Sequence, residues 1–224
     1  MTLADRRRRG RGKSIGDTIG MSASLGAVGS ATISSVDLRT AVLERARVEG
    51  NLVLVDEFLN HRVEPEVIAS VGKELAEVFT PLQPDLILTA EASGIPPAMA
   101  CSHEMGIPMV YAKKYLGTGD RYSIAREVAS PTKGVEYRVE VARRVLPPGL
   151  RVIIIDDFLA RGRTAEALGE IATEAGCDLL GFGFAVEKHW QGGRERLERH
   201  GWSVHSVVEL LSIEGSTVTI REGH

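Results

Sequence analysis

The sequence predicts an α/β fold in which a central, mainly parallel sheet has helices on both faces and a small hood beside it. From about residue 86 onward, apolar runs of four to six residues alternate with amphipathic helical patterns. Strands that are buried on both faces read as continuous apolar runs, and Val152–Ile155 is such a run. At 224 residues the chain is long enough to bury one full core.

The first regular elements are expected after residue 35. Apolar residues with Arg and Glu between them predict a short helix from Val36 to Val48, which Gly50 ends. A short strand is expected at 52–55 and a loop at 56–63. A helix should then run from the Glu64–Glu66 segment to about Phe79, with Pro65 in its first turn.

Beyond residue 80 strands and helices are expected to alternate. Strands are predicted at 86–90, 109–112, 152–156, 180–186 and 204–211, with weaker ones near 123–129 and 137–141. Helices are predicted at 96–105, 164–175 and 194–200. The segment between Lys114 and Arg144 has little periodicity, and we expect a lid there, with an ordinary hairpin as the alternative. Since ligands bind at the carboxyl ends of parallel strands, the residues that follow the strands are the candidates for function.

Residues 1–35 are predicted to be a disordered tail in front of a single domain at 36–224. The first 13 residues hold six basic residues and one acidic residue, and residues 14–35 are mostly Gly, Ser, Ala and Thr. Such a composition cannot bury enough apolar surface to offset the entropy of ordering. Because the rest of the chain is acidic, the basic run has no continuing basic face, and we expect no nucleic-acid partner.

The apolar runs also bear on localisation. None approaches the roughly 20 residues that cross a bilayer, and no apolar segment of a signal peptide follows the basic start. We therefore expect a cytoplasmic protein that does not contact a membrane. In that reducing compartment Cys101 and Cys177 are expected to be packing thiols.

The first motif with chemical meaning follows the apolar run at 152–155. Its residues are Asp156 and Asp157, then Ala160, Arg161, Gly162, Arg163 and Thr164 at the start of a predicted helix. Backbone N–H groups at a helix N-terminus form an anion pocket, and a threonine hydroxyl adds a donor. Two adjacent carboxylates can accept from the vicinal hydroxyls of a ribose, although a single aspartate would more simply cap the helix. The pattern therefore predicts a ribose 5-phosphate site.

A second small-residue turn follows the predicted strand at 86–90. It consists of Glu91, Ala92, Ser93 and Gly94. Such a turn can present backbone N–H groups to an anion, and the alternative is a plain connection to the next helix. A carboxylate would repel an anion, so Glu91 is expected to hold the loop through backbone N–H groups or to help position a cation through water.

These motifs resemble the signature of type I phosphoribosyltransferases, and within that family they are most similar to the xanthine phosphoribosyltransferases. The resemblance extends from about Leu38 to Glu222. It is carried, in order, by segments 58–61, 91–95, 156–160 and 186–188, followed by Gln191 and Gly193. The chain departs from the family at Arg161, where the family usually has Asn, and at Thr164, where it usually has Ala.

The resemblance implies a glycosyltransferase, more narrowly a pentosyltransferase. It would transfer phosphoribosyl from phosphoribosyl pyrophosphate to a 6-oxopurine, with xanthine the expected base, in purine salvage. Mg²⁺ would be bound mainly through the pyrophosphate, without a dedicated protein metal site. The resemblance further implies a homodimer and a base-binding hood made of residues 36–63 and the C-terminal region.

The resemblance also implies roles for the candidate residues. The catalytic pair would be Asp156 and Asp157. Phosphoribosyl pyrophosphate would be bound by the loop at 160–164, the turn at 91–94 and Lys113. The base would be bound by Val53, Asn60 and Lys188. Taken alone, a lysine is usually a surface charge and an asparagine a turn residue, so these positions depend on the resemblance.

Two alternatives remain open at this point. The base could be guanine, hypoxanthine or adenine. The chain could also be a nucleotide-sensing regulator that keeps the phosphoribosyl site without catalysis, because a shared fold does not prove an activity.

Overall fold

The computed structural model describes residues 36–115, 122–129 and 136–222. The described residues belong to one unit of the chain. The expected tail at 1–35 lies outside the described residues, and so do the parts of the expected lid at 116–121 and 130–135.

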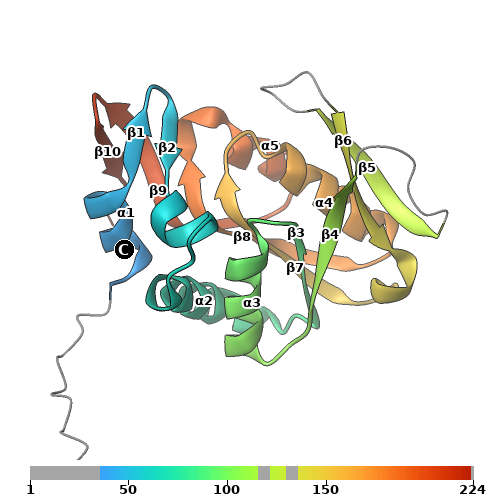
Figure 1. Ribbon diagram of the computed structural model, residues 1–224. Helices are drawn as coiled ribbons and strands as arrows, with labels where there is room; N and C mark the ends of the chain where they lie inside the picture. The colour runs from blue at the N-terminus through green and yellow to red at the C-terminus, as the bar shows by residue number, and fades with distance from the viewer. Residues whose placement is uncertain (1–35, 116–121, 130–135, 223–224) are drawn as a thin grey trace, which may run out of the picture. The chain divides into compact units, whose positions relative to one another are not determined.

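The described residues form one eight-stranded sheet in the order β10-β9-β8-β7-β3-β4-β6-β5 (Figure 1). Its parallel centre consists of β3 (Leu86–Ala90), β4 (Met109–Tyr115), β7 (Arg151–Leu159), β8 (Asp178–Lys188) and β9 (Val204–Glu214). The antiparallel strands lie at the two edges, and they are β10 (Thr217–Ile220), β5 (Ser123–Ala129) and β6 (Glu136–Ala142). The predicted mainly parallel sheet is therefore confirmed.

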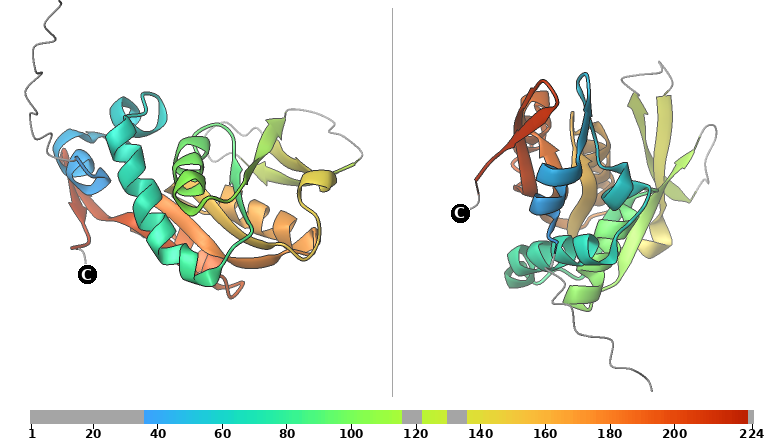
Figure 2. Two further views of the ribbon diagram at one scale, coloured as in Figure 1. Left: turned by 90° about the horizontal axis from the view of Figure 1, so that it is seen from below. Right: turned by 60° about the vertical axis from the view of Figure 1, so that its left-hand side comes forward.

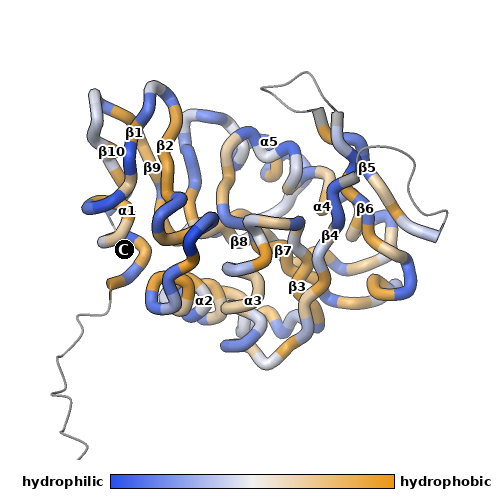
Figure 3. The backbone as a smooth tube through the Cα atoms, viewed as in Figure 1, coloured by the Kyte–Doolittle hydropathy of each residue, from blue (hydrophilic) through white to orange (hydrophobic). Residues whose placement is uncertain are grey.

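Helices cover both faces of this sheet (Figure 2). One face packs against α1 (Leu38–Arg45), α2 (Pro65–Phe79) and α3 (Ile95–Met105), and the other against α4 (Arg163–Glu174) and α5 (Gly193–Glu198). In β7, Ile153 and Ile155 join the first cluster, whereas Val152 and Ile154 join the second. Because side chains alternate between the faces of a strand, a continuous apolar run is what a doubly covered strand requires. Figure 3 shows hydrophobic residues gathered on these inner strands.

The first helix is shorter than the sequence predicted. The helix ends at Arg45, and β1 (Arg47–Glu49) pairs with β2 (Leu52–Leu54) in a two-stranded hairpin. Gly50 adopts a φ of +60° at the first position of the two-residue turn, a conformation that favours glycine and hairpins. The local alternation of polar and apolar residues after Arg45 therefore prevails over the helical pattern.

Several strands are longer than predicted. β7 continues to Leu159, so the two aspartates lie within its last residues rather than after it, and β8 continues to Lys188. The pattern missed β1 and β10, which are three and four residues long. The described parts of the segment between Lys114 and Arg144 form the antiparallel hairpin of β5 and β6, which was the alternative interpretation.

Short helical turns lie in the connections. They are η1 (Asp56–Asn60), η2 (Thr80–Leu82), η3 (Arg143–Val145) and η4 (His189–Gln191). The first of them, a π-helical turn, lies in the region that was predicted to be a loop.

The described helices and the cysteines add two simpler findings. No helix among the described residues is long and apolar enough to cross a membrane. Cys101 is fully buried in the first cluster, and burial raises the pKa of its thiol to about 12. Cys177 packs at the edge of the second cluster. Both cysteines are thus free packing thiols, as expected.

The contact between α2 and α3 depends on a missing side chain. A Cβ at Gly72 would lie 2.6 Å from the carbonyl carbon of Ala100. Gly72→Ala should therefore force the two helices apart and lower the free energy of unfolding by about 1–3 kcal/mol, measured by urea denaturation.

The matched control is Ala69→Gly on the exposed side of the same helix. That change measures the intrinsic difference between Ala and Gly in a helix, about 0.5–1 kcal/mol in favour of Ala. A Gly72→Ala protein more stable than the wild type would show that the contact between α2 and α3 accommodates an added methyl group.

Candidate functional site

The carboxyl ends of the parallel strands meet at one edge of the sheet. β7 pairs in parallel with β3 on one side and with β8 on the other, so the segments that follow them lie together. A cavity of about 410 Å³ opens at this edge. It is lined by Asp156, Phe158, Lys188, residues 160–165 and, from other segments, Leu52, Tyr137 and Gln191, among others. The position agrees with the general rule for ligand sites in α/β sheets.

The two adjacent aspartates are almost fully buried, with 9% and 6% of their surfaces exposed. Asp157 accepts hydrogen bonds from the Ser93 hydroxyl at 2.9 Å and from the Asn60 amide at 3.1 Å. The backbone N–H of Asp157 donates to Oδ1 of Asp156 at 2.9 Å. Asp156 is the member of the pair that lines the cavity. The structure therefore brings together predicted residues from the turn at 91–94, the 56–63 region and the end of β7.

The electrostatics of the pair differ from those of exposed carboxylates. Burial raises the pKa of Asp156 well above its usual range, and the neighbouring Asp157 adds to the increase. Lys114 at the end of β4 acts in the opposite direction. A protonated carboxyl can donate as well as accept a hydrogen bond, whereas an ionised one favours a cation or a hydroxyl donor. The pair thus provides an acidic site whose ionisation depends on what is bound.

The turn after β3 packs tightly against this pair. A Cβ at Gly94 would lie 2.5 Å from Oδ1 of Asp156 and would also clash with the hydroxyl of Thr89, so no side chain fits there. The Glu91–Ala92 peptide bond is cis. Oε1 of Glu91 accepts the backbone N–H of Lys114 at 2.8 Å, which is one of the two roles expected for that carboxylate. Lys113 is exposed on β4 and does not line the cavity.

The loop at 160–164 forms the opposite wall of the cavity. Gly162 has a φ of +71° and is the N-cap residue of α4, so the helix N-terminus begins at Arg163. A side chain at Gly162 would lie 3.0 Å from the carbonyl oxygen of Gly193. The N-terminal N–H groups of a helix and the cation of the exposed Arg161 suit an anion. The hydroxyls of Thr164 and Tyr137 lie 2.7 Å apart beside this terminus.

The three predicted base-binding residues differ in their positions. Lys188 lines the cavity, is 9% exposed and places its ammonium 5.1 Å from the centre of the Phe158 ring. Burial lowers the pKa of Lys188. Val53 packs in the core, and its exposed neighbour Leu52 lines the cavity instead. Asn60 is held by Asp157 and is not among the lining residues.

A buried ion pair lies behind Lys188. Glu187 is 1% exposed, and its carboxylate accepts from the guanidinium of Arg194 and from the hydroxyl of Ser206 at 2.7 Å. Arg194 also donates to Glu209 at 3.0 Å. Since Arg194 belongs to α5, the pair fixes the short connection that carries Gln191 into the cavity. Sequence reasoning missed this role, although Glu187 belongs to a quoted motif.

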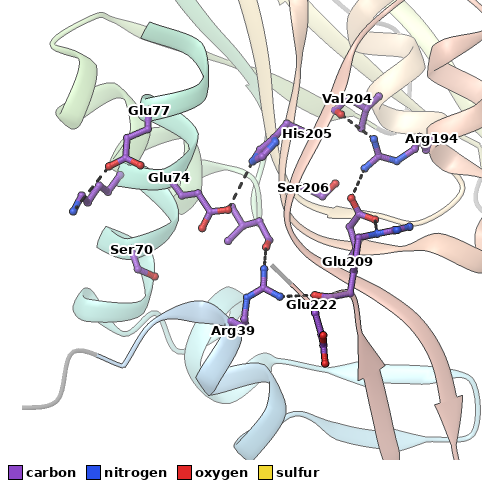
Figure 4. Close-up of a pocket in the computed structure, with 13 residues that line it drawn as sticks. Arg39, Ser70, Glu74, Glu77, Arg194, Val204, His205, Ser206, Glu209 and Glu222 are labelled. Atoms are coloured by element: carbon purple, nitrogen blue, oxygen red, sulfur yellow. Dashed lines mark hydrogen bonds and ion pairs between the residues drawn. The ribbon is translucent and has the colours of Figure 1, made fainter. Parts of the chain in front are cut away.

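A larger cavity of about 610 Å³ lies elsewhere, beside α1, α2 and β9 (Figure 4). Its charged side chains largely neutralise one another. Arg194 binds Glu209, His205 lies 3.8 Å from Glu74, and Arg39 donates to backbone carbonyls. None of the loops at the carboxyl ends of β3 and β7 lines it. We therefore place the candidate site at the smaller cavity.

Metal ligands are sparse in this part of the molecule. Within the described ranges, no group of three or more His, Cys, Asp or Glu side chains is arranged to hold a metal ion. The carboxylate oxygen atoms at the site come from Asp156, which lines the cavity, and from the adjacent Asp157.

Residues 54–197 match the family of the phosphoribosyl transferase domain. A xanthine phosphoribosyltransferase of Chloroflexus aurantiacus is 40% identical over 169 residues, which cover 75% of this chain and 80% of that protein. A xanthine phosphoribosyltransferase of Shouchella clausii is 38% identical over 188 residues, which cover 83% of this chain and 94% of that protein.

Solved structures show the same fold. An adenine phosphoribosyltransferase of Rhodothermus marinus has a TM-score of 0.58 and 28% identity, covering 66% of this chain and 81% of that chain. An enzyme of the same name from Giardia lamblia, in complex with 9-deazaadenine, has a TM-score of 0.66 and 18% identity, covering 79% and 99%.

The raised pKa of Asp156 predicts a pH dependence of stability. Above the ordinary aspartate pKa of about 3.9, the unfolded chain has lost a proton that folded Asp156 keeps. The free energy of unfolding should therefore fall as the pH rises through this window. Asp156→Asn removes this titration, so its stability relative to the wild type should increase as the pH rises above about 4, measured by urea unfolding.

Asp178→Asn is the matched control, because Asp178 is exposed on the same sheet. Its difference from the wild type should vary much less with pH. If the Asp156→Asn difference were also independent of pH, the buried carboxyl would not titrate as the structure implies.

Proposed function

We propose that this chain, which belongs to the phosphoribosyl transferase domain family and within it to the xanthine phosphoribosyltransferases, transfers phosphoribosyl from phosphoribosyl pyrophosphate to xanthine. The products are xanthosine monophosphate and pyrophosphate, and the activity serves purine salvage. One observation carries the proposal: Asp156 of a buried carboxyl pair, a helix N-terminus with a glycine cap and a buried lysine line a single cavity.

The ribose 5-phosphate would be held between β7 and α4. Asp156 accepts from the ribose hydroxyls, and Asp157 keeps Asp156 in place through its backbone N–H. Residues 160–164 surround the 5-phosphate with N–H groups and the cation of Arg161. A phosphate at this terminus gains from the helix dipole.

The pyrophosphate would leave along the turn at 91–94. The bond between C1 and the pyrophosphate oxygen breaks, a bond from C1 to a ring nitrogen of the base forms, and the proton of that nitrogen passes to water. Lys113 and the backbone N–H groups of residues 92–94 meet the departing anion. Glu91 keeps the turn against β4 through the N–H of Lys114.

The acidic residues fit a Mg²⁺ ion that enters with the pyrophosphate. Mg²⁺ prefers oxygen ligands, retains several waters and is commonly bound through one or two carboxylates together with substrate phosphates. Asp156 offers such an oxygen at the cavity surface, and its raised pKa marks a carboxyl that a nearby cation would help to ionise. When bound, the ion would neutralise charge on the pyrophosphate oxygens.

The base would lie beside Phe158 and Lys188. The ammonium of Lys188 can donate to a carbonyl oxygen, and xanthine has carbonyls at C2 and C6. Adenine would place an amine opposite this donor and leave both groups unpaired, which is costly in a buried site. We assign Asn60 and Val53 to the same side of the base, with Asn60 oriented by Asp157.

The division of the chain is also part of the proposal. Residues 36–63 and the C-terminal strands form the base-binding hood, supported by the shared core cluster of Leu38, Val53, Val208 and Val218. Residues 1–35 are a dispensable tail, and the active form is a homodimer.

A panel of bases tests the activity. The protein is incubated with phosphoribosyl pyrophosphate, Mg²⁺ and xanthine, guanine, hypoxanthine, adenine or a pyrimidine, and pyrophosphate release is measured. We expect the highest kcat/KM for xanthine and a value about tenfold or more lower for adenine. A preference for adenine, the base in the names of the similar solved structures, would reject the proposed base. If the protein turns over none of these bases, the result would favour the nucleotide-sensing regulator.

Lys188 is the residue that tests base recognition. Lys188→Ala should lower kcat/KM for xanthine by about 5- to 150-fold, because the base carbonyl loses its buried donor. The Kd for phosphoribosyl pyrophosphate, measured without base by calorimetry, should stay nearly unchanged. Lys73→Ala is the control, since Lys73 is exposed on α2. Loss of phosphoribosyl pyrophosphate binding with unchanged preference for xanthine would assign Lys188 to the phosphates instead.

A further inference from the structure

Tyr137 is a cavity residue that none of the sequence motifs includes. It lies near the start of β6, which pairs with β4 and with the edge strand β5, and 27 positions before Thr164 in the sequence. Both β6 and β5 pack against α4, the helix whose N-terminus forms the proposed phosphate site (Figure 1). Tyr137 and Thr164 line the same cavity as Gly162 and Arg163.

The hydroxyls of Tyr137 and Thr164 form a short hydrogen bond of 2.7 Å. Each hydroxyl carries one proton and can also accept, so the bond between them uses one proton and leaves the other for a third group. Either hydroxyl can donate in this geometry, and the greater acidity of a phenol favours the arrangement in which Tyr137 donates and Thr164 accepts. The proton of Thr164 is then free to donate to an anion in the cavity.

The position of Thr164 makes this proton useful. Thr164 is the second residue of α4, directly after Arg163 and the glycine cap, where helix N–H groups face an anion. A hydroxyl that rotates freely would have to be ordered when the anion binds. The bond from Tyr137 fixes the hydroxyl in advance.

Tyr137 is itself held from the other side. The ammonium of Lys114 lies 5.5 Å from the centre of the Tyr137 ring, within the range of a cation–π contact. Lys114 is on β4, and its backbone N–H binds Glu91 of the turn after β3. The contact therefore connects the turn at 91–94, through β4, to the start of α4.

We propose that Tyr137 is a positioning residue for the 5-phosphate of the ribose substrate: it donates to Oγ1 of Thr164 and thereby directs the Thr164 hydroxyl proton at a phosphate oxygen. The inference rests on the proposed function, because it needs a phosphate in the loop at 160–164. It adds a residue from the β5–β6 hairpin to a site otherwise built from strand ends.

The test compares Tyr137→Phe, Thr164→Val and the double variant. Each single change removes one hydroxyl and keeps the size of the side chain. The first measurement is the Kd for ribose 5-phosphate by calorimetry, which needs neither base nor catalysis. Tyr137→Phe should raise this Kd about 3- to 10-fold, the usual cost of one hydrogen bond. The matched control is Tyr111→Phe, because Tyr111 is exposed on β4 and should leave the Kd unchanged.

The double variant separates positioning from direct binding. If Tyr137 acts through Thr164, Tyr137→Phe should have no further effect in the Thr164→Val background. Full additivity of the two changes would overturn the inference, because Tyr137 would then bind the ligand independently.

Kinetics provide the second measurement. Tyr137→Phe should raise KM for phosphoribosyl pyrophosphate about 3- to 10-fold and leave KM for xanthine unchanged. A parallel increase in both KM values would indicate a general structural role and would overturn the inference. A wild-type protein that does not bind ribose 5-phosphate would reject the proposed function, and the inference with it. A wild type that binds while all variants bind equally well would reject the inference alone.

Discussion

Asp157 holds the site together through hydrogen bonds to two distant segments and to its own neighbour in β7. Its side chain accepts from Ser93 after β3 and from Asn60 in the π-helical turn, and its backbone N–H donates to Asp156. These segments are up to 97 positions apart in the sequence. A carboxyl group with two donors is well satisfied, so Asp157 can remain buried near the end of β7, beyond the apolar run Val152–Ile155. The adjacent Asp156 accepts this backbone N–H and lines the cavity, which makes it available to a ligand.

The burial of Asp156 lowers the stability of the fold and keeps a carboxyl available for a ligand. The same two-sided burial that makes β7 a rigid support also removes water from Asp156, and the resulting increase in its pKa is a cost of keeping the carboxyl ready. A hydroxyl-bearing ligand or a cation supplies the polar contact that the Asp156 carboxyl lacks once water is removed. Gly94 contributes to the same compromise, because any side chain there would occupy the space beside Asp156.

The sequence predicted the parallel centre of the sheet well. The apolar run at 152–155 indicates a strand that is buried on both faces, and the two aspartates indicate its carboxyl end. It could not predict contacts between distant segments. Whether Val53 or Leu52 faces the cavity depends on the register of a three-residue strand, and a shift of one position exchanges the two faces. Tyr137 was missed because β6 has weak periodicity and its partner lies in another motif.

The burial of Lys188 is the physical basis of the proposed base selectivity. Side chains alternate along β8, so Glu187 and Lys188 point to opposite faces, and the charge of Glu187 is taken up by Arg194 and Ser206. Among the described residues no carboxylate lies within ion-pair distance of Lys188, and its one recorded contact is the face of the Phe158 ring. A buried ammonium without a carboxylate partner gains most from a ligand that brings its own acceptor. A base with carbonyl oxygens meets that need and one with an amine at that position does not, so the absence of a carboxylate partner beside Lys188 supports the proposed preference for an oxopurine.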